Sequence, residues 1–93
     1  MQTDDRPIEI YAPPLYRPGD KVRSTRTIRN DGTIWGVEVG HIVVTKGDVG
    51  YVRDIGTFLQ EFYVYAVEFV DRGSVVGMRA RELARLDNEG DTR

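Results

Sequence analysis

The chain has 93 residues, 40% of them hydrophobic and 10% aromatic, and its 15 acidic and 13 basic side chains give a formal net charge of −2. This length and composition predict one small globular domain and exclude a disordered chain. The sequence contains no cysteine, which excludes disulfides and thiolate ligands for zinc or iron–sulfur clusters, and no apolar run is long enough to span a membrane. The acidic N-terminus lacks the apolar segment of a secretory signal, so we expect a cytoplasmic protein.

The first segment is predicted to be an extended arm. Residues 1–18 contain all four prolines of the chain, and proline lacks the backbone donor that the interior of a sheet requires. Apolar side chains such as Ile10 and Leu15 can hold this arm on the surface of the domain. A turn at Pro18-Gly19-Asp20 follows, and the alternation over 21–28 then predicts a first strand.

Further strands are predicted where β-branched and aromatic residues gather between turn signals, and the links 59–61 and 71–74 are of hairpin length. These strands are 42–44, 49–58, 62–70 and 75–79.

Two segments are less regular. Residues 29–41 hold three glycines and show no clean period, which predicts a long loop. Residues 80–82 predict one helical turn. The chain after it either forms a closing strand at 83–86 or continues the turn as a single helix over 80–86, because the period fits both.

Together these elements predict an all-β fold: a small SH3-like barrel of about five strands, with a short helical turn and an extended N-terminal arm. We assign residues 1–18 to the arm, 19–86 to the barrel domain and 87–93 to a flexible C-terminal tail. The strand over 62–69 is apolar on both faces, although a small open barrel buries only one of them. We therefore expect the arm, the long loop or a partner to cover its second face.

The candidate binding residues are polar or aromatic and lie in two places. Arg29, Asn30 and Asp31 precede a glycine, a pattern that predicts a turn and, at an exposed loop tip, a docking surface. Trp35, in the same loop, is either a lid over the barrel or an anchor for a partner.

The second place is the strand over 49–58. Tyr51 is a possible aromatic anchor, and Arg53 and Asp54 either pair across the sheet, with Glu68 for example, or contact a partner.

Other chemistries find little support in the sequence. His41 is the single histidine and has no second ligand beside it, so we expect neither a metal site nor a cofactor, and no catalytic residues. Basic residues concentrate in 16–29, which fits RNA or an acidic protein surface. Because the whole chain is acidic, we do not expect nucleic acid as a partner.

Several of these segments resemble one known family. Ile28-Arg29-Asn30-Asp31-Gly32-Thr33, the run from Lys46-Gly47 to Asp54, Gly56-Thr57-Phe58-Leu59-Gln60 and the closing Val76-Gly77-Met78-Arg79 resemble the NifZ family of nitrogen-fixation accessory proteins. The resemblance covers about 19–86, with the segments in order and at plausible spacing. In this family a cysteine often stands where Met78 stands here.

The resemblance implies a non-catalytic cytoplasmic accessory protein that assists P-cluster maturation of the nitrogenase molybdenum–iron protein. It implies as partners the immature molybdenum–iron protein and other nitrogenase assembly factors. Because the chain has no cysteine, we expect it to hold a conformation of its client rather than to carry a cluster. Two alternatives stay open: an RNA-binding or ribosome-associated SH3-like module, and a docking subunit of an electron-transfer enzyme.

Overall fold

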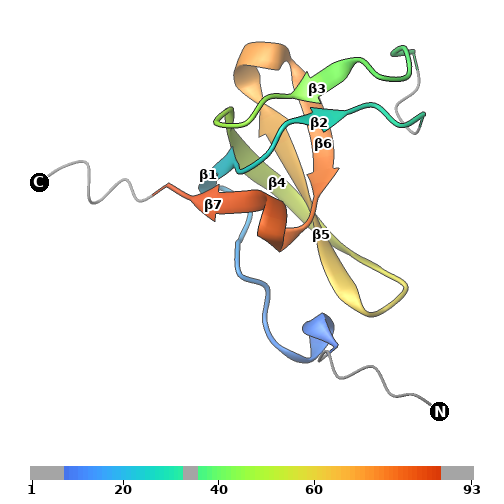
Figure 1. Cartoon of the computed structure of the whole chain (residues 1–93). Helices are drawn as coiled ribbons and strands as arrows, with labels where there is room; N and C mark the ends of the chain where they lie inside the picture. The colour runs from blue at the N-terminus through green and yellow to red at the C-terminus, as the bar shows by residue number, and fades with distance from the viewer. Residues whose placement is uncertain (1–7, 33–35, 87–93) are drawn as a thin grey trace, which may run out of the picture.

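The computed structural model describes residues 8–32 and 36–86, which form two antiparallel sheets (Figure 1). The larger sheet has the strand order β6-β5-β4-β1-β7, and the smaller one pairs β2 with β3. The strands are β1 (Lys21–Ser24), β2 (Ile28–Arg29), β3 (Ile42–Val44), β4 (Val49–Phe58), β5 (Phe62–Phe69), β6 (Ser74–Met78) and β7 (Leu83–Arg85). Three short 3₁₀ turns, η1 (Glu9–Tyr11), η2 (Val70–Arg72) and η3 (Ala80–Glu82), complete the described elements.

The predicted all-β fold is confirmed, with seven strands and only 3₁₀ turns in the described part of the chain. The predicted helical turn at 80–82 is η3, and the closing strand follows it as β7, so the alternative of one helix over 80–86 is wrong. No strand pairing joins the two sheets in 8–32 and 36–86, so the barrel is open rather than closed.

The prediction of one strand over 21–28 needs correction, because β1 ends at Ser24. The Ser24 hydroxyl donates to the carbonyl of Arg26 (2.6 Å), and the next amide, Thr25, donates to the carbonyl of Glu82 (2.9 Å). These bonds turn the chain away from the larger sheet, and it resumes as β2 in the smaller sheet. A serine hydroxyl that bonds a nearby backbone group competes with strand pairing, and alternation alone does not reveal it.

The core lies where the smaller sheet packs over the inner face of the larger one (Figure 1). Its fully buried side chains come from β1, β3, β4, β5 and β6, and the largest of them are Tyr65, Phe69, Met78, Val22 and Val44. Tyr65 and Met78 are cross-strand partners, so Met78 fills the centre of this core rather than the surface. Position 78 is therefore a packing position in this chain.

The N-terminal arm runs beside β5. The amide of Ile10 donates to the carbonyl of Glu61 (3.2 Å), and the amide of Tyr63 donates to the Glu9 carboxylate (2.8 Å). Further along, the Tyr65 hydroxyl accepts a hydrogen bond from the Leu15 amide (3.0 Å), and burial raises the pKa of this hydroxyl. The arm thus satisfies polar groups of β5 on the side of the inner face, where Tyr63 and Tyr65 lie.

The outer face of β5 has a different environment. Phe62 packs against Phe58 with ring centroids 5.5 Å apart, and the Arg79 guanidinium lies 3.4 Å above the Phe62 ring. Such a cation–π contact both covers the ring and holds the cation. Val64 and Ala66 on this face are half-buried, between glycines of the neighbouring strands, Gly56 and Gly77.

The turn at 45–48 makes the stability of the fold depend on pH in the acid range. The Asp48 carboxylate accepts the Thr45 amide (2.9 Å) and pairs with Arg72, and these contacts hold its pKa below the ordinary value. A carboxylate whose pKa is lower in the folded than in the unfolded state stabilises the fold fully at a pH above its unfolded-state pKa, about 3.9 for Asp. This stabilisation is lost as the pH falls through the pKa of the folded state. We expect the gap in unfolding free energy between wild type and Asp48→Asn to shrink over that acid range.

Urea titrations of both proteins between neutral pH and strong acid measure this gap. Glu61→Gln, which removes an exposed carboxylate in the β4–β5 turn, serves as the control for the loss of one negative charge. A gap for Asp48→Asn that stays constant down to strong acid would contradict the assigned role of Asp48.

Candidate functional site

Asn30 is a buried organiser of the loop after β2. Its side chain is only 3% exposed, and its amide nitrogen donates to the carbonyls of Val37 (2.7 Å) and Glu38 (3.2 Å). Its amide oxygen accepts the Gly32 amide (3.0 Å), and Gly32 has a positive φ of 106°. A hydrogen bond from a backbone amide to the side chain of an asparagine two residues before it stabilises a turn, and this is the turn that the Asn-Asp-Gly pattern predicts. Asn30 therefore shapes the loop and does not present its side chain to solvent.

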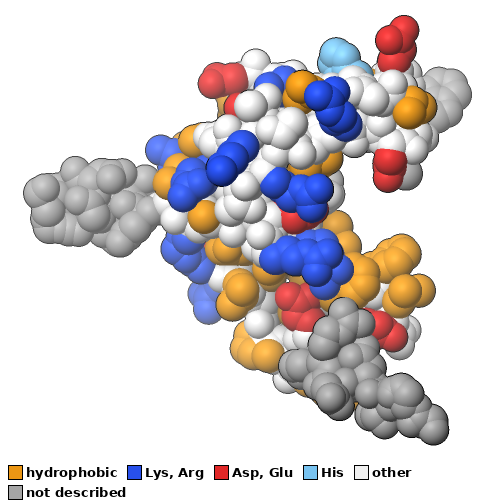
Figure 2. Space-filling model, viewed as in Figure 1, with side chains coloured by type: hydrophobic (Ala, Val, Ile, Leu, Met, Phe, Trp, Pro, Cys, Tyr) orange, Lys and Arg blue, Asp and Glu red, His pale blue; other side chains and the backbone are white. Residues whose placement is uncertain are grey.

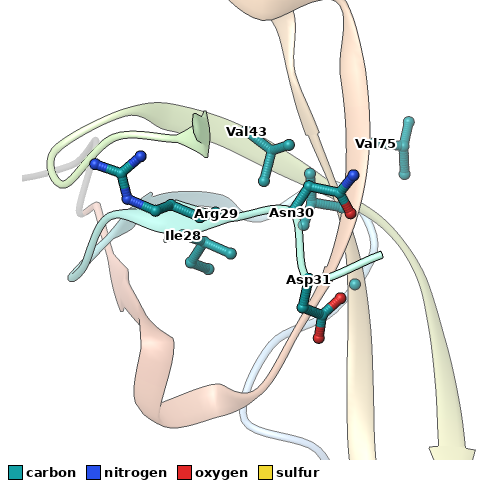
Figure 3. A pocket seen from close by; sticks show the side chains of 8 residues that line it. Ile28, Arg29, Asn30, Asp31, Val43 and Val75 are labelled. Carbon is teal, nitrogen blue, oxygen red and sulfur yellow. The ribbon is translucent and has the colours of Figure 1, made fainter. Parts of the chain in front are cut away.

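Arg29 and Asp31, the two neighbours of Asn30, are exposed. The Arg29 guanidinium donates to the carbonyl of Gly40 (2.9 Å), which places it over the returning end of the loop. Arg29 has no carboxylate partner within residues 8–32 and 36–86. Figure 3 shows Arg29 and Asp31 extending from opposite ends of this short segment. Trp35 lies outside the described residues.

A groove lies beside this segment. It has a volume of about 390 Å³ and lies between β2 with the residues after it and the β6 strand (Figure 3). Its lining residues are Ile28, Arg29, Asn30, Asp31, Val43, Val75, Val76 and Gly77. The groove thus joins segments that are more than forty residues apart in the sequence, at the place where the barrel is open.

The second group of candidates lies on the outer face of β4. Tyr51 is 41% exposed and stands opposite Glu68 of β5. Arg53 forms an ion pair with Glu68, which confirms the predicted cross-strand partner. Asp54 accepts the amide of Ile55 (2.8 Å), at an irregularity where β4 shifts register against β5. The Arg53 charge is thus already paired, whereas the Tyr51 ring is open to a partner.

The structure does not bring the two groups into contact. Across the sheet, Tyr51 of β4 stands opposite Glu68 of β5, and Glu68 stands opposite Val75 of β6. Val75 in turn lines the groove together with Asp31. The candidates therefore border one continuous surface that spans three strands. Sequence reasoning missed Val75, which is 57% exposed, because only the strand order places it between the two groups.

Basic side chains dominate one side of the molecule. Figure 2 shows Lys and Arg side chains across the middle of the viewed face, with acidic side chains mainly toward its ends. Within the described part of the chain, six cations have no carboxylate partner: Arg17, Lys21, Arg23, Arg29, Lys46 and Arg81. Exposed cations without partners favour an acidic binding surface, because no internal carboxylate must be displaced.

Among the described residues, no group of three or more His, Asp or Glu side chains is arranged to hold a metal ion. His41 is exposed, and its backbone carbonyl accepts the Asn30 amide (2.8 Å). None of the helices in 8–32 and 36–86 is long and apolar enough to cross a bilayer.

Comparison with known proteins identifies relatives along most of the chain. A family model described as the NifZ domain matches residues 13–85. A probable NifZ protein of Rhodobacter capsulatus is 64% identical over 78 residues, which are 84% of this chain and all of that protein. A putative NifZ protein of Sinorhizobium fredii is 61% identical over 85% of this chain and 73% of its own length. The NifZ protein of Azotobacter vinelandii is 44% identical over 75% of this chain and 44% of its own length. No solved structure matches the chain.

Proposed function

Because this chain belongs to the NifZ family and so has an accessory role in nitrogen fixation, we propose that it docks on the immature nitrogenase molybdenum–iron protein and assists P-cluster maturation without catalysing a reaction itself. The observation that carries this proposal is the family match over 13–85, which includes both sheets and the groove. The docking surface consists of Arg29, Asp31, Tyr51, Arg53 and Asp54, with Asn30 holding the loop in shape.

Two features of the described residues support a docking role. The surface between the two groups of candidates is apolar at Val75 and aromatic at Tyr51, and such residues supply contact area when a partner excludes water. Two cations without carboxylate partners among the described residues lie beside it, Lys21 opposite Tyr51 and Arg29 in the groove with Val75, and they attract an acidic client. The pairing of Arg53 with Glu68 provides a charged pair that can be rearranged on docking.

The test is anaerobic binding of the purified chain to immature and mature molybdenum–iron protein, side by side. We expect tighter binding to the immature form, because an accessory protein must leave when maturation is complete. Equal affinity for both forms, or binding to neither, would contradict the proposal. If the chain instead elutes with RNA and binds it with a steep salt dependence, the RNA-binding alternative is correct.

The proposed surface predicts the effect of one double variant. Arg29→Glu combined with Arg53→Glu should weaken binding to the immature client at least about tenfold, because both cations become repulsive to an acidic surface. Isothermal titration or interferometry measures the affinity, and circular dichroism checks the fold.

The matched control is Arg17→Glu combined with Arg81→Glu, which alters two exposed arginines by the same total charge. We expect this control to bind nearly as well as wild type. Wild-type affinity in the Arg29 and Arg53 double variant would show that these residues do not carry the interaction.

A further inference from the structure

The turn between β4 and β5 holds two residues in a backbone conformation that neither of them favours. The amide of Glu61 donates to the carbonyl of Phe58 (3.0 Å), so Leu59 and Gln60 are the central residues of this turn. Their φ angles are 56° and 54°, and no other non-glycine residue in the described part of the chain has a positive φ. Turns of this kind favour Asn-Gly, because most side chains there bring Cβ too close to a backbone carbonyl oxygen. The turn is therefore strained, and a different pair of residues would relieve it.

The strained turn presents apolar side chains to solvent. Leu59 is 68% exposed, and Phe58 beside it is also exposed. The arm adds the exposed Tyr11, next to Ile10, whose amide donates to the carbonyl of Glu61. Figure 1 shows this end of the hairpin projecting from the two sheets, and Figure 2 shows hydrophobic side chains gathered at the same end. Strained residues concentrate at functional sites, and clustered exposed apolar side chains mark interaction surfaces, so the combination indicates contact with a partner.

Aromatic packing supports the base of the turn. The rings of Phe58 and Phe62 have centroids 5.5 Å apart, and the Arg79 guanidinium lies 3.4 Å above the Phe62 ring. Arg79 is held in turn by its own amide, which donates to the Glu82 carboxylate (2.9 Å). A side chain that is oriented before binding loses less entropy on binding, so this turn is suited to act as an anchor.

Shape and chemistry select an apolar cleft on a protein as the occupant. A projecting tip buries its side chains only when it enters a concave surface, and such surfaces on proteins are mostly apolar. Gln60 and Glu61 follow Leu59 directly, and their polar groups need hydrogen-bond partners that a protein cleft supplies and membrane hydrocarbon does not. Contact between the tips of two copies would bury far less than the roughly 800 Å² per partner of a standard interface.

The tip also continues the proposed docking surface. The residues of β4 that pair with the outer-face residues of β5 are Phe58, Gly56, Asp54 and Tyr51. The tip and Tyr51 therefore lie on one face of the same strand, and Gly56 adds no side chain between them. One client can contact both.

We propose that Leu59, at the tip of the β4–β5 hairpin, anchors the client protein by inserting into an apolar cleft on its surface. This inference rests on the proposed function for the identity of the client, the immature molybdenum–iron protein. Leu59 and Phe58 supply the apolar contact, and the polar residues further along β4 orient the client. Asn-Gly would relieve the strain of the turn but would remove the anchor.

Leu59→Asn combined with Gln60→Gly in the full chain tests this inference. We expect the double variant to unfold at a higher urea concentration than wild type, because both strained residues are replaced by those that the turn favours. We also expect it to bind the immature client at least about tenfold more weakly under anaerobic calorimetry, because the buried leucine is lost. A protein that is more stable and binds more weakly does not owe the weaker binding to misfolding.

Two single variants are the controls. Gln60→Gly keeps Leu59, and Leu15→Asn makes the same change at another leucine that is 61% exposed, so both should bind the client like wild type. Wild-type affinity in the double variant, or an equal loss in Leu15→Asn, would overturn the anchor but leave docking intact. A double variant less stable than wild type would overturn the strain. If wild type does not bind the client, the proposed function is overturned, and this inference with it.

A second copy of the chain and a lipid surface are the competing occupants. Sedimentation of the chain alone measures the first, and flotation with phosphatidylcholine vesicles measures the second. Self-association or vesicle binding that the double variant abolishes would overturn the client cleft.

Discussion

Gly50→Ala is expected to destabilise the fold by about 3 kcal/mol, because the interior offers no room for one additional carbon. A Cβ at position 50 would lie 2.5 Å from the carbonyl oxygen of Glu68, 2.8 Å from Val67 Cγ1 and 3.0 Å from Phe69 Cδ1. The nearest of these atoms is backbone, so relief requires β4 and β5 to separate. Since Gly50 also pairs with Val22 of β1, the disturbance reaches the centre of the sheet.

Urea or thermal unfolding measures this loss, and Gly56→Ala is the matched control. Gly56 lies in the same strand, has no atom within 4 Å of the added Cβ and does not have a positive φ. Alanine loses less backbone entropy on folding than glycine, so we expect Gly56→Ala to be neutral or to stabilise by up to about 1 kcal/mol. Equal losses in the two variants would show that the close approach at Gly50 is not the cause.

Asn30→Asp should cost about 2–3 kcal/mol, although the two side chains have nearly the same shape. The amide nitrogen donates two hydrogen bonds, to the carbonyls of Val37 and Glu38, and a carboxylate can donate neither. It would also place a negative charge against two carbonyl oxygens at a site that is 3% exposed. The loop after β2 should therefore loosen, and the wall of the groove with it.

Urea unfolding measures the stability of Asn30→Asp, and amide exchange at Gly40 and His41 reports on the loop. In wild type the Gly40 amide donates to the Asn30 carbonyl (2.7 Å), so its exchange should accelerate in the variant. Glu38→Gln, which changes an exposed side chain of the same loop, should leave both measurements unchanged. An Asn30→Asp protein with wild-type stability and exchange would show that these hydrogen bonds contribute nothing.

Local patterns predicted most of the fold. The β-branched and aromatic residues over 49–58 and 62–70, with a link of hairpin length between them, correctly predicted the hairpin of β4 and β5, because a two-stranded antiparallel unit depends on nearby residues. Local composition also predicted the turn of η3, but it left the closing strand β7 and a single helix over 80–86 equally open, and the structure decides for the strand. The end of β1 at Ser24 could not be predicted in this way. It depends on the Glu82 carbonyl, which lies far away in the sequence.

The candidate site was predictable in part. The Asn-Asp-Gly pattern identified the turn, and the cross-strand partner of Arg53 followed from strand pairing. The burial of Asn30 could not be predicted, because an asparagine in a loop is usually exposed. The groove could not be derived either, since it requires β2 to lie beside β6, and no local pattern encodes the packing of one sheet on another.

The end of the β4–β5 hairpin that contacts the N-terminal arm has fewer strand partners than the rest of the sheet, which affects local unfolding. The chain before β1 bonds β4 as far as Val52, and β6 pairs with β5 only from Tyr65 onward. The end of the hairpin, 56–58 paired with 62–64, is therefore a two-stranded ribbon. Such a ribbon is marginal in water, and here the arm bonds it at Glu61 and Tyr63. We therefore expect the ribbon and the part of the arm at 9–12 to open locally more readily than the core, in which Tyr16 of the arm is itself buried.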